Sequence, residues 1–201
     1  MLLACNVVTL VFAFFNPPVV VSVLFLYWAE CLVIGLLNIA KLWYVEPISG
    51  VSESELAQMT PKERFSHKGL GIGIFVAHYG LFLFGVFGVM LTLGRLEMAA
   101  KGVRDFHMAS HVAVFWLPVL LMGVGHTVSF FRNFLGKREF AGRNYHDQMI
   151  RPYKRTFLLL LIMFGGGFLI TATGQPGAGV LVFVPFMLIA SLDAHFRERA
   201  A

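Results

Sequence analysis

Six apolar runs are the feature that most constrains how this sequence can fold, because each run has to be removed from water. They cover residues 2–15, 19–45, 69–93, 109–134, 156–173 and 179–194. A helix that crosses a bilayer needs about 20 apolar residues, and the second, third and fourth runs are long enough. Charged residues make up only 13% of the chain, whereas about a quarter is usual in soluble domains. We therefore predict an all-α fold, in which residues 1–201 form a single polytopic membrane domain of about six transmembrane helices.

Short motifs between the runs predict where helices turn and begin. The Pro- and Gly-containing stretches NPP and GQPGA follow the first and fifth runs, and they predict two helical hairpins. Ser52 with Glu55, and Thr60 with Glu63, match the S/T-x-x-E capping box, and Pro61 falls at a first helical position. These signals predict one or two short helices on the cytoplasmic membrane surface between the second and third runs.

The Lys and Arg residues predict the orientation of the bundle, since cytoplasmic loops are enriched in both. Of the 16 in the chain, only Arg95, Lys101 and Arg104 fall opposite the termini if both termini lie on one side. The other side holds Lys41, Lys62, Arg64, Lys68, Arg132, Lys137, Arg138, Arg143, Arg151, Lys154, Arg155, Arg197 and Arg199. We therefore predict that both termini are cytoplasmic. The positive charge then serves topology and attraction to anionic lipid headgroups, so the predicted partner is the lipid bilayer and not nucleic acid.

Polar side chains inside the runs are candidate functional residues, because burial in hydrocarbon is costly for them. The candidates are Glu30, Asn38 and Lys41 in the second run, His78 in the third, and His126, Ser129 and Asn133 in the fourth. The last three are spaced i, i+3 and i+7 on one helical face, which predicts a polar seam between the fourth helix and the third or second. Arg155, Asp193 and His195 are predicted to form a polar cluster at the inner membrane surface.

Two imidazoles are expected at nearly the same depth on consecutive antiparallel helices, namely His78 and His126. Two such side chains could hold a bis-histidine haem b or supply part of a zinc or copper site. The competing interpretation is that each imidazole makes an interhelical hydrogen bond that fixes packing. Both interpretations stay open at the level of the sequence.

Glu30 also has two interpretations. It is either a site that binds and releases a proton during transport, or a structural side chain that is hydrogen-bonded to Tyr27 or to a neighbouring helix. Ser129 lies one turn after His126, but the chain has no GxSG and no other signature of an activated nucleophile. We therefore predict a packing role for Ser129 and no catalytic residue.

The order of YWAE, HYG, HTVSFFRNFLGKREF, PYKR and LDAHFRER resembles a family of bacterial polytopic membrane proteins that is known only as a domain of unknown function. The resemblance extends from the second run to the C-terminus and implies a bacterial inner-membrane location, without implying an activity. It points to the candidate residues given above. In the family pattern one further His follows HYG and another opens the fifth helix, where this chain reads FGVFG and TFLLLL. A haem or metal site that needed those two residues would be lost here.

We therefore expect an integral inner-membrane protein that works as a scaffold or accessory subunit of a membrane complex. One alternative is a redox or metal protein that uses His78 and His126. A second alternative is a small proton-coupled carrier that uses Glu30. Because no catalytic signature is present, we do not expect an enzyme acting alone.

Overall fold

The computed structural model describes residues 20–46, 52–100 and 116–173. They form the helices α2 (Val20–Tyr44), α3 (Glu53–Gln58), α4 (Pro61–Ala100), α6 (Trp116–Ser129) and α7 (Tyr145–Thr173), with a π-helix η1 (Phe130–Leu135) and a 3-10 helix η2 (Glu139–Gly142). No strand occurs within these ranges, so the predicted all-α class is confirmed there. The first and sixth apolar runs, both predicted hairpin turns, Asp193 and His195 lie outside the described residues.

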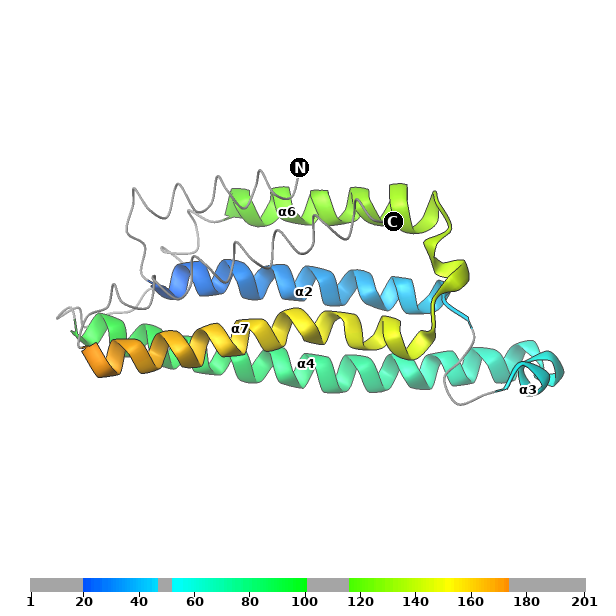
Figure 1. Cartoon of the computed structure of the whole chain (residues 1–201), viewed down its shortest axis with the longest axis horizontal. Helices are drawn as coiled ribbons and strands as arrows, with labels where there is room; N and C mark the ends of the chain where they lie inside the picture. Colours follow the sequence, from blue (N-terminus) through cyan, green and yellow to red (C-terminus); the bar gives the residue numbers. More distant parts are fainter. Residues whose placement is uncertain (1–19, 47–51, 101–115, 174–201) are drawn as a thin grey trace.

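Helix α2 is the centre of the described bundle. It packs against α4, α7 and α6, and α6 lies on the side of α2 that faces away from α4 (Figure 1). The core along α2 includes Tyr27, Cys31 and Leu42, which are 2%, 1% and 0% exposed. Gly35 allows α2 to come close to α4, because a Cβ at this position would overlap the ring of Tyr79.

The two capping boxes are confirmed. Ser52 accepts a hydrogen bond from the backbone of Glu55 and its own backbone N–H donates to the Glu55 carboxylate, at the start of α3. Thr60 and Glu63 make the same reciprocal pair at the start of α4, where Pro61 is the first helical residue. The second box opens no separate surface helix. No proline follows Pro61 in this helix, so α4 continues without a break into the third apolar run and ends at Ala100.

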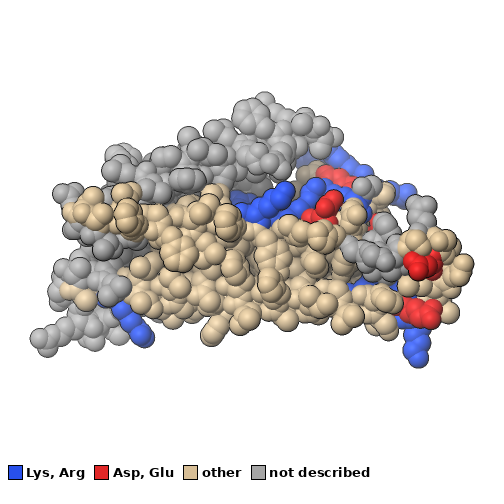
Figure 2. Space-filling model, turned by 60° about the horizontal axis from the view of Figure 1, so that its bottom comes forward, with Lys and Arg blue, Asp and Glu red and all other residues tan. Residues whose placement is uncertain are grey.

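Two described helices are long and apolar enough to cross a membrane. The stretches are Leu24–Tyr44 in α2 and Pro61–Arg95 in α4, and α6 with η1 adds a shorter apolar stretch, Val119–Leu135. Lys, Arg, Asp and Glu gather over the part of the bundle nearest α3, whereas most of the remaining surface in this view carries none (Figure 2). The other spans and the cytoplasmic termini stay predictions.

Candidate functional site

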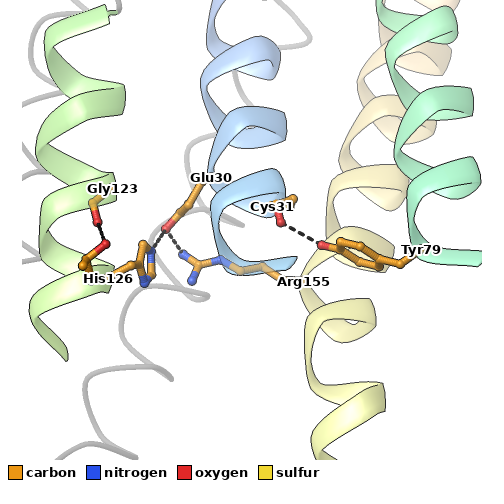
Figure 3. Close-up of polar contacts among 7 residues, drawn as sticks. Glu30, Cys31, Tyr79, Gly123, His126 and Arg155 are labelled. Atoms are coloured by element: carbon orange, nitrogen blue, oxygen red, sulfur yellow. Dashed lines mark hydrogen bonds and ion pairs between the residues drawn. The ribbon is translucent and has the colours of Figure 1, made fainter. Parts of the chain in front are cut away.

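A buried carboxylate joins three helices in the described bundle. Glu30 of α2 is 2% exposed. Its Oε1 lies 2.7 Å from Nη2 of Arg155 on α7 and 3.1 Å from Nε2 of His126 on α6 (Figure 3). Glu30 therefore links α2, α6 and α7 by polar contacts, and we call Glu30, His126 and Arg155 the Glu30 clasp.

The local sequence explains how each side chain reaches the clasp. His126 follows Gly125, which is buried, and small residues allow helices to approach closely. Arg155 is the last charged residue of α7 before the charge-free stretch at 156–173, so its long side chain can extend from the polar end of the helix to Glu30.

The charges within the clasp are complementary. Arginine is protonated at every accessible pH, so Arg155 supplies a permanent positive charge to Glu30. An ionised carboxylate can only accept hydrogen bonds, so His126 carries its hydrogen on Nε2 and donates it to Glu30. The guanidinium of Arg155 also lies over the ring of Tyr27, 5.8 Å from its centroid. A buried pair with such added contacts offsets more of its desolvation cost than a bare ion pair does.

The clasp has hydrogen-bonding capacity left over. Within the described part of the chain, the buried Tyr27 hydroxyl and Nε of Arg155 make no hydrogen bond of regular geometry, although the two side chains lie against each other. Buried donors of this kind cost free energy unless something accepts from them. These two atoms are the places where an added hydrogen-bond acceptor would stabilise the cluster.

Of the predicted polar seam, His126 contacts α2, and Ser129 and Asn133 hydrogen-bond to each other. His126 reaches Glu30, and Nδ2 of Asn133 donates to Oγ of Ser129 at 3.2 Å across the start of η1. The prediction that this seam packs on the third helix is wrong. The third helix is α4, which lies on the other side of α2 (Figure 1).

A second polar contact joins α2 to α7, near the end of α2 and the start of α7. Nε2 of Gln148 donates to Oδ1 of Asn38 at 2.6 Å, and both side chains are 2% exposed. Oε1 of Gln148 accepts from Nη1 of Arg143 at 2.9 Å. Sequence reasoning found Asn38 but missed Gln148. The spacing of seven residues between Gln148 and Arg155 places both on one face of α7 and could have revealed this pair.

The two imidazoles have separate partners. Nδ1 of His78 hydrogen-bonds with the hydroxyl of Tyr153 on α7 at 2.8 Å, and the His78 side chain is exposed. His126 hydrogen-bonds to Glu30 instead. His126 lies on α6, and α2 separates α6 from α4, the helix that carries His78 (Figure 1). Each imidazole therefore makes an interhelical hydrogen bond, as the packing interpretation requires. Within the described ranges, no three or more His, Cys, Asp or Glu side chains gather as metal ligands would.

Two further predicted residues, Lys41 and Arg155, lie in different parts of the bundle. Lys41 lies above the ring of Phe134, with Nζ 5.5 Å from the ring centroid. Arg155 was predicted to join Asp193 and His195 at the inner surface, and the structure pairs it with Glu30. Because Asp193 and His195 fall outside the described residues, the rest of that predicted cluster stays a prediction.

The comparisons with known proteins give a family without an assigned activity. No curated protein and no solved structure matches the chain. A family model described as a family of unknown function, DUF6498, matches residues 1–201, and the expectation of a family of unknown function is thereby confirmed. The chain belongs to the DUF6498 family of unknown function.

Proposed function

We propose that this protein is a multi-pass protein of a bacterial inner membrane, with about six transmembrane helices and both termini in the cytoplasm. We propose further that it acts as a scaffold or accessory subunit of a membrane complex. The Glu30 clasp supports this proposal, because its ionisable side chains contact one another across three helices and so stabilise the bundle.

The outer surface of α4 supports a position in the membrane. No Lys, Arg, Asp or Glu occurs between Lys68 and Arg95, a helical length of about 39 Å against the roughly 30 Å of a hydrocarbon core. Leu81 and Phe84 in this stretch are 72% and 73% exposed. Contiguous exposed apolar side chains indicate contact with lipid or with other apolar surfaces.

The pairing within the clasp supports a structural role for Glu30. A carboxylate that carries protons during transport has to become neutral in part of its cycle. Neutralising Glu30 here would leave the permanent charge of Arg155 buried without its counter-charge, which is strongly unfavourable. The clasp is therefore better suited to fixing the bundle than to cycling between charge states.

One observation favours a second candidate, the proton-coupled carrier. His126 hydrogen-bonds directly to Glu30, and its side chain is 14% exposed. A hydrogen bond between two ionisable side chains is a route by which a proton can pass, so a carrier would use Glu30 together with His126.

The charge-neutral double variant Glu30→Gln/Arg155→Gln separates the two candidates, because it removes both buried charges together. For a scaffold, we expect the variant to remain in the same high-mass complex as the wild type on native gels of solubilised membranes. For a carrier, we expect it to lose proton uptake in vesicles that carry a pH-sensitive dye. The scaffold proposal is contradicted if wild-type protein runs only as a single chain while the vesicles show proton uptake that depends on Glu30.

An absorption spectrum tests the histidine alternative on the same preparation. A haem protein would show a Soret band that His78→Ala and His126→Ala each remove, and a metal protein would carry near-stoichiometric zinc or copper. Either result would replace the scaffold proposal with a redox or metal function.

A further inference from the structure

Three basic side chains meet where α2 ends and α7 begins. Lys41 lies in the last turn of α2, Arg143 follows η2, and Arg151 lies in the second turn of α7. The Nζ of Lys41 and the guanidinium carbon of Arg143 are 5.5 and 5.4 Å from the centroid of the same ring, that of Phe134. Arg143 and Arg151 both lie close enough to Lys41 to repel it electrostatically. We call these three residues the basic cluster.

The basic cluster carries more positive charge than the described neighbouring residues balance. Glu139 pairs with Arg143 at 2.6 Å, whereas Lys41 and Arg151 make no ion pair among the described residues. Asp147, one turn before Arg151, is exposed and makes none there either. Burial and the nearby Arg151 lower the pKa of Arg143, which reflects the same crowding. Like charges held together in a partly desolvated site favour the binding of an anion.

The surroundings of the basic cluster indicate where such an anion would come from. Trp43 and Tyr44, which follow Lys41 in α2, are 45% and 47% exposed, and Trp43 packs edge-on against Phe65 of α4. Exposed Trp and Tyr at the end of an apolar helix are typical of the level of the lipid headgroups. Charged side chains gather at this end of the bundle (Figure 2). At this level, the phosphates of membrane lipids are the anions nearest to the cluster.

We propose that Lys41, Arg143 and Arg151 form a binding site for the phosphate of an anionic phospholipid headgroup. The inference rests on the proposed membrane location and adds a specific ligand to it. Lys41 and Arg151 supply the charge that no ion pair balances among the described residues, and Glu139 is the acidic neighbour of Lys41 there. Arg143 is held in place by Glu139 and Gln148 and completes the basic wall of the site.

Native mass spectrometry of detergent-solubilised protein tests the site with dioleoyl-phosphatidylglycerol and, as the neutral-headgroup comparison, dioleoyl-phosphatidylcholine. We expect wild-type protein to retain phosphatidylglycerol at least tenfold more than phosphatidylcholine. The variant Lys41→Gln/Arg151→Gln should lose that preference, since both unbalanced charges are gone. The matched control Lys62→Gln/Lys137→Gln removes the same charge from exposed positions and should keep the preference. Arg151→Gln alone alters only an exposed side chain, and it should reduce the preference severalfold if the double variant fails to fold.

Three results would overturn the inference. The first is equal retention of the two lipids by wild-type protein, and the second is equal loss in the cluster variants and the control. The third is displacement of phosphatidylglycerol by an equal concentration of inorganic phosphate, which would make the ligand a soluble phosphate. Extraction of cell membranes with alkaline carbonate keeps this inference apart from the proposed function. Release of the protein by carbonate contradicts the membrane location, whereas a retained protein without lipid preference contradicts the basic cluster alone.

Discussion

Glu30 and Arg155 lie about 125 residues apart in the chain and are the most consequential pair of side chains in the described structure. A buried ion pair adds little net stability compared with well-packed apolar residues, but removal of one member leaves an uncompensated charge. Glu30 is almost completely buried, so loss of the Arg155 charge alone would leave the Glu30 carboxylate buried without its counter-charge. Stability therefore falls when one of the two charges is removed alone, and much less when both are removed together.

The substitution Arg155→Met tests this dependence. We expect it to lower the free energy of unfolding by about 3–5 kcal/mol, because Glu30 would be left buried with only His126 as partner. The thermal midpoint of the detergent-solubilised protein, followed by size-exclusion chromatography after heating, measures the effect. The double variant Glu30→Leu/Arg155→Met should recover most of the loss. The control is Arg95→Met, which changes an exposed residue near the C-terminal end of α4. Equal midpoints for Arg155→Met and Arg95→Met would contradict the pairing of Arg155 with Glu30.

A matched pair of glycines tests the close approach of α2 and α4. Gly35→Ala places a methyl group against the ring of Tyr79, whose hydroxyl bonds to the backbone carbonyl oxygen of Cys31 and to Thr156. We expect a loss of about 1–3 kcal/mol from the overpacking. Gly73→Ala meets nothing within 4 Å and should leave the midpoint unchanged or raise it slightly, because alanine favours helix. Similar midpoints for the two variants would mean that α2 and α4 are not packed in this way.

Helix α3 shows how much a single capping box determines in an element of six residues. The hydrogen bond from the backbone N–H of Ser52 to Glu55 lowers the pKa of the Glu55 carboxyl. A folded pKa below the unfolded one stabilises the helix above the unfolded pKa, and this stabilisation disappears as the pH falls through the folded pKa. The short helix therefore depends on an ionised Glu55.

We predict that the protection of the α3 amides against hydrogen exchange, corrected for intrinsic rates, is constant near neutral pH and falls below about pH 4.5, the usual pKa of a Glu carboxyl. Exchange measured by mass spectrometry on peptic peptides of this region checks the pH dependence. Glu55→Gln should remove the pH dependence, and Gln58→Ala, in the last turn of α3, should preserve it. A wild-type profile that stays flat through this range would show that the box does not hold α3.

The elements differ in how well the sequence predicted them. The starts of α3 and α4 followed from the capping boxes, because a cap is a local motif that neighbouring residues complete. The π-helix η1 did not follow from the sequence, because the residues FFRNFL suit an α-helix equally well. Glu30 was identified because burying a carboxylate in hydrocarbon is costly, and Arg155 was also a candidate residue, but the pairing of the two was not predicted. Which helix faces Glu30 depends on the rotation and packing of the whole bundle, which no local pattern encodes.

At the scale of the whole molecule, the proposed topology makes a prediction about the two ends of α4. A single cysteine in place of Ser66 should react with a membrane-impermeant maleimide only in inside-out vesicles, and one in place of Arg95 only in spheroplasts. A cysteine in place of Phe84, within the apolar stretch, should react only after solubilisation. The background variant Cys5→Ala/Cys31→Ala serves as the unlabelled control. Labelling of both ends from the same side would contradict a membrane-spanning α4.

The Glu30 clasp also has a consequence for biosynthesis. His126 follows Glu30 by 96 residues, which corresponds to roughly 5–20 s of synthesis at about 5–20 residues per second. In the proposed topology, α2 enters the membrane during that interval with a carboxylic side chain that has none of its final partners. A chain that stops before α6 would keep this exposed defect permanently, and quality-control proteases could recognise it without reading any sequence motif. The unpaired Glu30 would thus distinguish, during synthesis, an incomplete chain from one long enough to include α6 and α7.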